Sequence, residues 1–418
     1  MNKIKTVFAR MVLDSRGHPT IEVSVDVGKG QGRAISPSGA SSGTLEAQEL
    51  RDGGKAFFGL NVTKAIHNVN ALIAPKLKGL DAGKQKKIDD VLIQLDGTTI
   101  KSHLGANAIV ATSMAVCAAE SDAQGKPLYE IVAKMAGNKH YSLPVPMLNV
   151  INGGKHAGNP LPVQECLVIP KNARSFFDCL QIGTEIYHNL RSQVRDRFGK
   201  QSINVGDEGG FTPPLSHTED ALKLIELASK DLGYAKNLSI GLDVAANTFY
   251  KENAYQYEGK KFDNIPFVEY WESLLREHPI VSLEDPFAEE DWQAWCALHK
   301  GAPSLQLVGD DLLSTRVDRI QRAHKLGACN AVIIKPNQVG TVSEAIAAVS
   351  AARSAGMKVI ASHRSGDSED TFMADFAVGI GADFVKFGAP CRSERTAKYN
   401  RLLAIEAELG KKGSFGSK

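Results

Sequence analysis

The sequence has 418 residues, of which 43% are hydrophobic and 23% are charged, and its formal net charge is +2. This composition indicates a folded protein with one or two sizeable cores, and the dispersed lysines and arginines argue against nucleic acid as a primary partner. No apolar run approaches the roughly 18 residues of a membrane span and no apolar signal segment opens the chain, so we expect a cytoplasmic protein. The six scattered cysteines contain no CxxC pair and are expected to be reduced core thiols.

The first third of the chain predicts a small α+β domain. Apolar and polar residues alternate in two segments, and helical periodicity follows in three more. Between the strands and the first helix, residues 36–43 are rich in serine and glycine, which predicts a mobile loop able to close over a ligand. The predicted strands span 7–13 and 20–27, and the predicted helices span 46–50, 62–74 and 108–124.

From about residue 143, short apolar runs alternate with polar clusters and, in most cases, with helical patterns. Eight such units predict a closed parallel β/α barrel of the TIM type, with functional residues at the carboxyl ends of the strands. We therefore expect an α/β protein with a small N-terminal capping domain over residues 1–137 and a barrel domain over 138–418. The apolar runs span 145–150, 166–169, 238–242, 280–283, 305–308, 331–334, 358–361 and 383–385. The helical patterns span 176–198, 219–232, 267–277, 291–298, 316–326, 342–355, 371–379 and 395–409.

Three acidic residues end three successive predicted strands of the barrel. Asp243, Glu284 and Asp310 would direct hard oxygen ligands to a common point, which is typical of a Mg²⁺ site. Any one of them could instead cap the helix that follows, but three at corresponding positions favour the metal site. No cysteine accompanies them, and only the more distant His156 and His363 could join, which argues against a soft metal.

Two lysines also end predicted strands. Lys335 follows one apolar run and Lys386 lies two strands further on, with Arg364 between them. If these cations crowd one another, repulsion lowers the pKa of a lysine and makes it a usable base. The alternative is that each lysine extends to solvent.

Further polar groups lie in glycine-rich turns near the same barrel mouth. Glu208, within residues 204–211, is a candidate acid, because it lies in a glycine-rich loop where the backbone can approach a ligand. The alternative is a calcium site, but the loop lacks the alternating oxygen ligands of a calcium-binding loop. Glu165 precedes a strand, and His156 lies in a flexible turn. The set suits removal of a proton next to a carboxylate, stabilisation of the resulting anion by metal, and loss of a leaving group to an acid.

At the level of whole motifs, the chain resembles the enolase family. The resemblance runs from Ala9 to Gly410 and so covers almost the entire chain. It includes SLEDP at 282–286 and SHRSG at 362–366. Other matching motifs lie at 13–17, 38–41, 104–108, 156–159, 205–210, 309–312, 337–340 and 388–395.

The resemblance implies a Mg²⁺-dependent carbon–oxygen lyase that interconverts 2-phosphoglycerate and phosphoenolpyruvate in glycolysis and gluconeogenesis. It also implies two Mg²⁺ ions per active site, with Mn²⁺ as a substitute, a phosphorylated carboxylate as the substrate, and a homodimer or larger homo-oligomer. Asp243, Glu284 and Asp310 would hold the first Mg²⁺, and Ser41 of the closing loop would help to complete the second site.

The resemblance assigns the remaining site residues to proton transfer and substrate binding. Lys335 would take the proton from carbon 2, and Glu208 would protonate the departing hydroxyl with support from Glu165 and His156. The residues that would bind the substrate are Gln164, His363, Arg364, Ser365 and Lys386.

The chain departs from the family pattern beside several of these residues. Lys155 precedes His156, Pro336 follows Lys335, and Asn247 and Thr248 follow the first metal aspartate. Such changes leave two alternatives open: a paralogue acting on a phosphonate or carboxylated analogue of phosphoenolpyruvate, or a non-catalytic surface or binding protein on the same fold. Secondary exposure at the cell surface also stays open.

Overall fold

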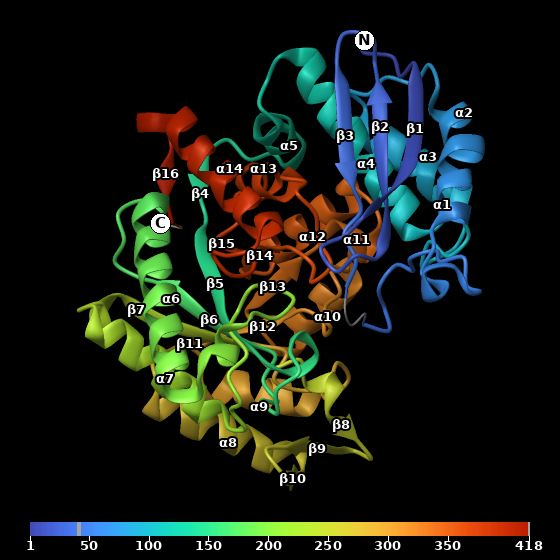
Figure 1. Cartoon of the computed structure of the whole chain (residues 1–418). Helices are drawn as coiled ribbons and strands as arrows, with labels where there is room; N and C mark the ends of the chain where they lie inside the picture. Colours follow the sequence, from blue (N-terminus) through green and yellow to red (C-terminus); the bar gives the residue numbers. More distant parts are fainter. Residues whose placement is uncertain (40–42, 417–418) are drawn as a thin grey trace.

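The computed structural model describes residues 1–39 and 43–416. A small N-terminal domain lies at one end of a closed barrel, as Figure 1 shows. Among the described residues, no helix is both long and apolar enough to cross a membrane. All six cysteines are free thiols, and four of them are buried.

The small domain is built on an antiparallel sheet of three strands, β1 (Thr6–Leu13), β2 (Pro19–Asp26) and β3 (Gln31–Ile35). Helix α4 (Ala106–Gln124) packs on β2 and β3, and its many alanines and other small residues are buried there. Small side chains allow this close approach of helix and sheet. The other helices are α1 (Thr63–His67), η2 (Asn68–Ile73), α2 (Ala74–Leu77), α3 (Gln85–Asp96) and α5 (Leu128–Ala136).

The predicted helix over residues 46–50 is wrong. This segment is irregular, because its backbone amides bond to distant carbonyls: Ala47 N to Gln338 O at 2.8 Å and Gln48 N to Ile100 O at 2.6 Å. These tertiary hydrogen bonds replace the bonds that a helix would form.

All eight apolar runs of the second domain form strands, and these close into the predicted barrel. Their interior side chains are almost entirely buried, as the apolar composition requires. In chain order the strands are β5 (Val145–Asn152), β6 (Glu165–Pro170), β7 (Leu238–Asp243), β11 (Ile280–Glu284), β12 (Gln306–Gly309), β13 (Ala331–Ile334), β14 (Lys358–Ser362) and β15 (Phe384–Lys386).

The prediction of a fully parallel barrel is wrong for one strand. β6 runs antiparallel to both of its neighbours, with Glu165 opposite Asn152 on β5 and Asp243 on β7. The connection from β5 contains only the short turn η3 (Gly154–His156) in place of the crossover helix that a parallel pair needs. The first residues of β6 therefore lie at the same barrel mouth as the last residues of the other strands.

The predicted barrel helices are confirmed and cover the outside of the barrel (Figure 1). A small antiparallel sheet between β7 and α8 was not predicted; it comprises β8 (Tyr250–Lys251), β9 (Ala254–Tyr257) and β10 (Lys260–Phe262). The helices are α6 (Phe176–Phe198), α7 (Thr218–Asp231), α8 (Asn264–Glu277), α9 (Trp292–Gly301), α10 (Val317–Leu326), α11 (Pro336–Val339), α12 (Val342–Ser354), α13 (Phe372–Gly379) and α14 (Ser393–Leu409).

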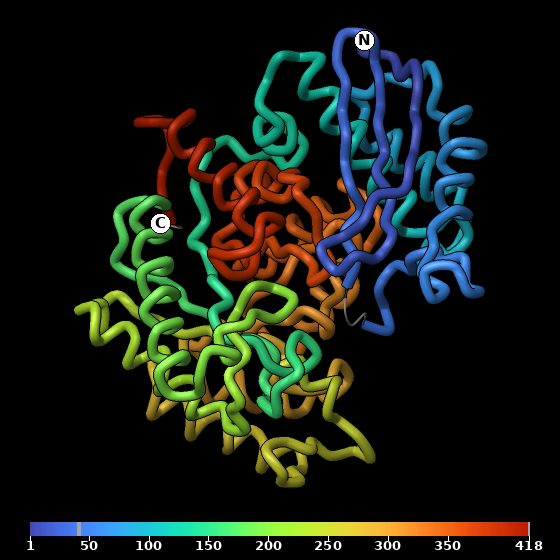
Figure 2. The backbone as a smooth tube through the Cα atoms, in the orientation of Figure 1, coloured from blue at the N-terminus to red at the C-terminus, as the bar shows by residue number. Residues whose placement is uncertain are grey.

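The chain that follows β3 brings the small domain to the barrel mouth. Figure 2 shows this blue segment descending from the sheet toward the barrel. Ser38 and Gly366 exchange backbone hydrogen bonds of 2.8 Å in both directions. Both domains thus border the space above the strand ends.

Candidate active site

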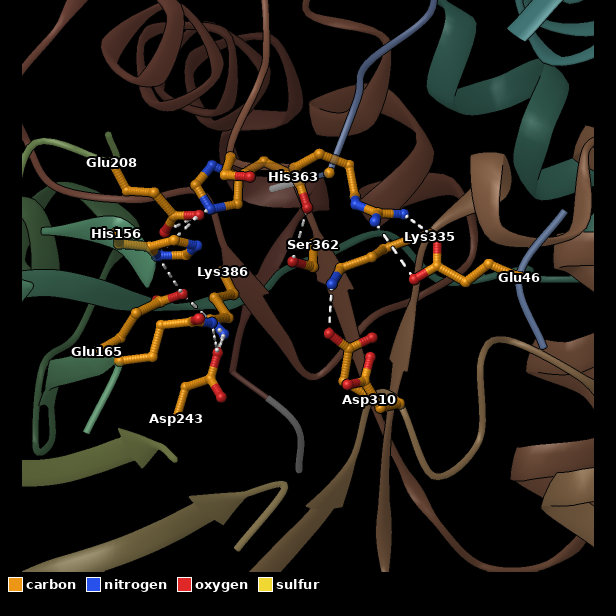
Figure 3. A pocket seen from close by; sticks show the side chains of 15 residues that line it. Glu46, His156, Glu165, Glu208, Asp243, Asp310, Lys335, Ser362, His363 and Lys386 are labelled. Atoms are coloured by element: carbon orange, nitrogen blue, oxygen red, sulfur yellow. Dashed lines mark hydrogen bonds and ion pairs between the residues drawn. The ribbon is translucent and has the colours of Figure 1, made fainter. Parts of the chain in front are cut away.

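One polar cavity lies at the barrel mouth, and most of the predicted site residues line it (Figure 3). His156, Glu165 and Glu208 lie on one side of this cavity, and Lys335 and Asp310 lie on the other. The predicted residues that line the cavity are His156, Gln164, Glu165, Glu208, Asp243, Asp310, Lys335, His363, Arg364, Ser365 and Lys386. Glu284 contacts Lys386 beside the cavity, and Ser41 lies outside the described residues.

The ammonium group of Lys386 lies among three carboxylates. Its Nζ is 2.7 Å from Asp243 Oδ2, 2.9 Å from Glu284 Oε2 and 3.3 Å from Glu165 Oε1. Burial lowers the pKa of Lys386, but the attraction of these carboxylates outweighs burial and raises it well above the ordinary value. Lys386 is therefore a fixed cation in this state.

Lys335 faces Asp310 and is held from its backbone. Its Nζ forms an ion pair with Asp310 Oδ2, and its backbone amide donates to Thr315 Oγ1 at 3.0 Å. Burial lowers the pKa of Lys335, while Asp310 raises it, and the net change is upward. Arg364 and Lys386 lower the pKa of Lys335, as expected of neighbouring cations, but the nearby carboxylates outweigh them, so the predicted net lowering is wrong for this arrangement.

Pro336 is compatible with this arrangement. It is the first residue of α11, where a proline ring has the required φ and the missing amide hydrogen has no helical partner to lose. Gln338 of the same short helix donates to Asp310 Oδ1 at 2.8 Å. The proline after Lys335 therefore starts a helix that orients the opposing aspartate.

The three predicted metal ligands follow consecutive strands. Asp243 and Glu284 are paired across β7 and β11, and Asp310 directly follows β12. Burial, reinforced by Asp243, raises the pKa of Glu284 to about 8. A donor set made of carboxylate oxygens with excess negative charge fits a hard divalent cation.

Asp285 orients the acidic pair that follows β12. It accepts the backbone amides of Asp310 at 3.0 Å and Asp311 at 2.7 Å. Carboxylate oxygens of these three aspartates lie within 4.8 Å of one another, so they form a second acidic group beside the first. Sequence reasoning gave Asp285 no role. Its side chain acts by accepting the backbone amides of two residues that follow β12, and such a contact cannot be read from the sequence.

His156, Glu165 and Glu208 form a buried group on the opposite wall. His156 Nδ1 lies 3.5 Å from Glu165 Oε1 and 3.7 Å from Glu208 Oε1. Asn149 donates to Glu208 Oε2 at 3.2 Å. Burial and the nearby charge of Glu208 raise the pKa of Glu165 well above its usual range, so this carboxylate pair retains a proton.

His363 lies between Glu208 and Arg395. The guanidinium of Arg395 donates to His363 Nδ1 at 2.7 Å, and His363 Nε2 lies 3.0 Å from Glu208 Oε2. Burial lowers the pKa of His363 to about 4, so the ring is neutral, and its proton lies on Nε2 because Nδ1 accepts. Arg395 belongs to a motif found in the sequence, but nothing there indicated this role.

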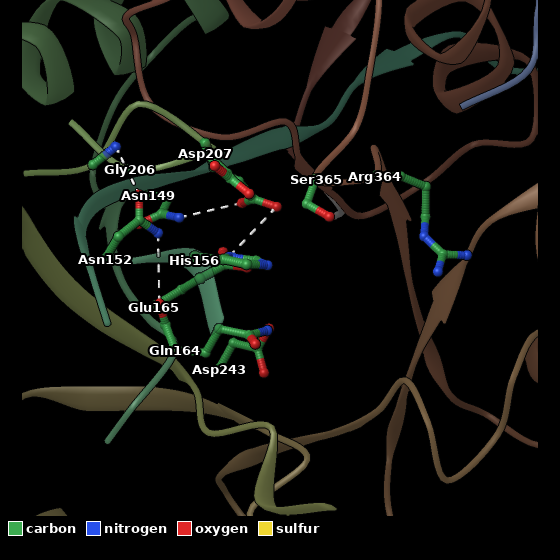
Figure 4. Close-up of polar contacts among 12 residues, drawn as sticks. Asn149, Asn152, His156, Gln164, Glu165, Gly206, Asp207, Asp243, Arg364 and Ser365 are labelled. Carbon is green, nitrogen blue, oxygen red and sulfur yellow. Dashed lines mark hydrogen bonds and ion pairs between the residues drawn. The ribbon is translucent and has the colours of Figure 1, made fainter. Parts of the chain in front are cut away.

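Arg364 faces the small domain across the cavity. Its Nη1 lies 2.7 Å from Glu46 Oε2, and both residues are buried. Figure 4 shows Arg364 on the side opposite His156 and Glu165. Sequence reasoning missed Glu46, because the pair joins residues 318 positions apart.

The other departures from the family pattern have structural partners of their own. Asn247 donates to Asp311 Oδ2 at 3.0 Å and accepts the amide of Glu289 at 3.0 Å. Thr248 donates to Ala245 O at 2.8 Å. Lys155 is exposed next to buried His156. These side chains support the turns around the cavity or face away from it.

Both parts of the chain match family models. Residues 4–132 match the model described as Enolase, N-terminal domain, and residues 140–418 match Enolase, C-terminal TIM barrel domain. A protein named enolase from Methanocaldococcus jannaschii is 48% identical over 409 residues, covering 98% of this chain and 96% of its own. A protein of the same name from Mastigamoeba balamuthi is 46% identical over 432 positions, covering 100% of this chain and 98% of its own.

Proposed function

The chain belongs to the enolase family of hydro-lyases, and from this premise we propose that it interconverts 2-phosphoglycerate and phosphoenolpyruvate with Mg²⁺ in glycolysis and gluconeogenesis. One observation carries the proposal most directly. Lys335 and Glu208 border the same cavity from opposite sides, so a base and an acid can act on neighbouring carbons of one bound substrate.

Asp243, Glu284 and Asp310 would hold one Mg²⁺, or Mn²⁺ in its place, and Ser41 would contribute to a second. When bound, the cations would neutralise the negative charge that develops on the substrate carboxylate. The carboxylate cluster supports this part of the proposal, because the ion pairs that its three carboxylates form within the described residues are with two lysine side chains, Lys335 and Lys386.

Lys335 is the proposed base for the proton on carbon 2. It lies on a rigid support, since its backbone amide bonds to Thr315 and the next residue starts α11. Lys386 would bind the substrate carboxylate, for which its buried ammonium is suited. Gln164, whose side chain reaches Asp243 Oδ2 at 3.4 Å, would line this part of the pocket.

Glu208 is the proposed acid for the hydroxyl that leaves carbon 3. His156 and Glu165 lie beside it, and the raised pKa of Glu165 keeps a proton next to Glu208. Neutral His363 would direct its Nε2 hydrogen at Glu208 or at the substrate. Arg364 and Ser365 would bind the phosphate, for which a guanidinium and a hydroxyl are suitable donors.

The same proposal includes a cytoplasmic location, a homodimer or larger homo-oligomer, and a domain division between residues 137 and 138. These points rest on the family resemblance and on the change of sequence pattern near residue 140.

The test is to add 2-phosphoglycerate and Mg²⁺ to purified protein and follow the ultraviolet absorbance of phosphoenolpyruvate. We expect the absorbance to rise, to stop rising when a chelator is added, and to resume with added Mg²⁺ or Mn²⁺. Folded, metal-loaded protein that forms no phosphoenolpyruvate would refute this function and direct attention to phosphonate or carboxylated analogues.

A further inference from the structure

A further group of potential metal ligands, separate from the acidic groups at the barrel mouth, lies on the outside of the barrel between α7 and α8. His278 directly follows α8 and precedes Pro279, which holds its backbone in the extended conformation observed. β11 begins two residues later, so His278 lies at the amino end of a strand whose carboxyl end carries Glu284. Figure 1 shows α7 and α8 on the part of the barrel away from the small domain.

One nitrogen of His278 has a fixed partner and the other has none among the described residues. Nδ1 lies 2.6 Å from Glu226 Oε1 of α7, and since a carboxylate accepts, Nδ1 donates in this contact. Nε2 is buried without a hydrogen-bond partner in that part of the chain, and the whole side chain is only 5% exposed. Nε2 is therefore the ring nitrogen left available as a ligand atom in the described part of the chain.

Two carboxylates complete the group. Ligand atoms of Glu219, Glu277 and His278 all lie within 4.8 Å of one another. Glu219 and Glu226 lie seven residues apart on one face of α7, so one carboxylate orients the imidazole while the other lies among the potential ligands. A histidine that donates its second nitrogen to a carboxylate is the arrangement found around protein-bound zinc.

We propose that Glu219, Glu277 and His278 bind a borderline divalent cation, Zn²⁺ by preference, with water in the remaining position. One imidazole and two carboxylates with an open fourth position suit zinc better than Mg²⁺, which avoids nitrogen. Lys223 pairs with Glu219 Oε1 at 2.5 Å and is largely exposed, so this ammonium competes with the cation and is free to move aside.

The test is equilibrium dialysis of the full chain against Zn²⁺, with Mg²⁺ in large excess to occupy the barrel mouth. We expect the wild-type chain to retain one more zinc than Glu277→Gln or His278→Gln. Glu226→Gln is expected to weaken this zinc by about 10- to 100-fold, because it removes the group that orients His278. Lys223→Gln is expected to tighten it.

Glu269→Gln is the matched control, because Glu269 is an exposed carboxylate on the same helix and belongs to no such group. It should retain the wild-type amount of zinc. Equal zinc retention by wild type and Glu277→Gln would overturn the proposal. Because Glu277 is exposed, Glu277→Gln tests the proposal even if His278→Gln does not fold. Conversion of 2-phosphoglycerate by Glu277→Gln in Mg²⁺ is expected to be unchanged, so this result is independent of the proposed function.

Discussion

Arg395 determines which nitrogen of His363 carries the proton. Its guanidinium also donates to three backbone carbonyls that surround the cavity: Arg364 O at 2.6 Å, Ser365 O at 2.5 Å and Asp207 O at 3.0 Å. The side chain is fully buried, so water cannot replace these bonds. A single residue of α14 thus joins the loop after β14 to the loop that carries Glu208.

Replacing this side chain should reduce stability as well as activity. Arg395→Met removes the guanidinium donor of all three carbonyls, of which Ser365 O keeps the Ser15 hydroxyl at 3.4 Å, and we expect it to lower the free energy of unfolding by about 3 kcal/mol or more. The measurement is the unfolding midpoint in denaturant. Arg392→Met is the control; Arg392 is partly exposed, pairs with Glu394, and makes only long contacts with Gly206 O at 3.3 Å and Ser15 O at 3.5 Å, so its loss should cost about 1 kcal/mol or less. Equal losses in the two variants would contradict the role given to Arg395.

At the scale of elements, the reversed strand β6 accounts for the position of Gln164 and Glu165. These residues precede their apolar run, whereas the other acids and lysines follow theirs. Because β6 points away from the mouth, its first residue is level with Asp243, the last residue of β7. The reversal thus supplies polar groups to the cavity from a strand that would otherwise direct them to the opposite end.

The same reversal brings α6 close to β5, and Gly183 is at the point of contact. A methyl group at this position would lie 2.0 Å from Leu148 Cδ1. Overpacking of this kind lowers the free energy of unfolding by about 1 to 3 kcal/mol. The higher helix propensity of alanine than of glycine offsets about 1 kcal/mol of this loss. We therefore expect Gly183→Ala to lower the unfolding midpoint.

A double-mutant cycle checks the cause. Leu148→Val removes the atom in conflict, so the combined variant should lose less stability than the sum of the two single variants, by about 1 kcal/mol. Strict additivity would show that the two residues do not clash.

Much of this architecture could be predicted from the sequence, for physical reasons. The eight apolar runs predicted the barrel strands because each is bounded by polar turns, and residues placed at their ends lie together at the mouth. The direction of β6 could not be predicted, since it depends on how residues 153–164 turn back. Glu46, Gln338 and Arg395 were missed because their roles arise only from contacts with residues remote in the chain.

At the scale of the whole molecule, a buried carboxylate joins the two domains. Asp89 of α3 accepts from Ser113 Oγ at 2.7 Å and from the amide of Ser343, at the start of α12, at 2.9 Å. Burial raises the pKa of Asp89 to about 6, although these hydrogen bonds oppose the change. The folded protein therefore binds a proton here more tightly than the unfolded chain.

This difference predicts how stability changes with pH. The contribution of Asp89 is complete below about pH 4 and is lost as the pH rises through about 6, a change of about 3 kcal/mol. Asp89→Asn should not show this loss of stability. As the pH is raised from about 4 to above 6, the unfolding temperature of the variant should therefore increase relative to that of the wild type. Asp90→Asn, beside it on the helix surface, should show no such trend. A parallel pH dependence in wild type and Asp89→Asn would exclude this role.

The central claim is that Lys335 removes the proton from carbon 2 and that Glu208 then protonates the carbon 3 hydroxyl, which leaves as water. The most direct measurement is exchange of the carbon 2 hydrogen of 2-phosphoglycerate in deuterated water, followed by NMR in parallel with formation of phosphoenolpyruvate. The account predicts that Glu208→Gln still exchanges this hydrogen while product formation falls by about 10² to 10⁴-fold, and that Lys335→Ala loses both. Exchange at the wild-type rate by folded Lys335→Ala would contradict it.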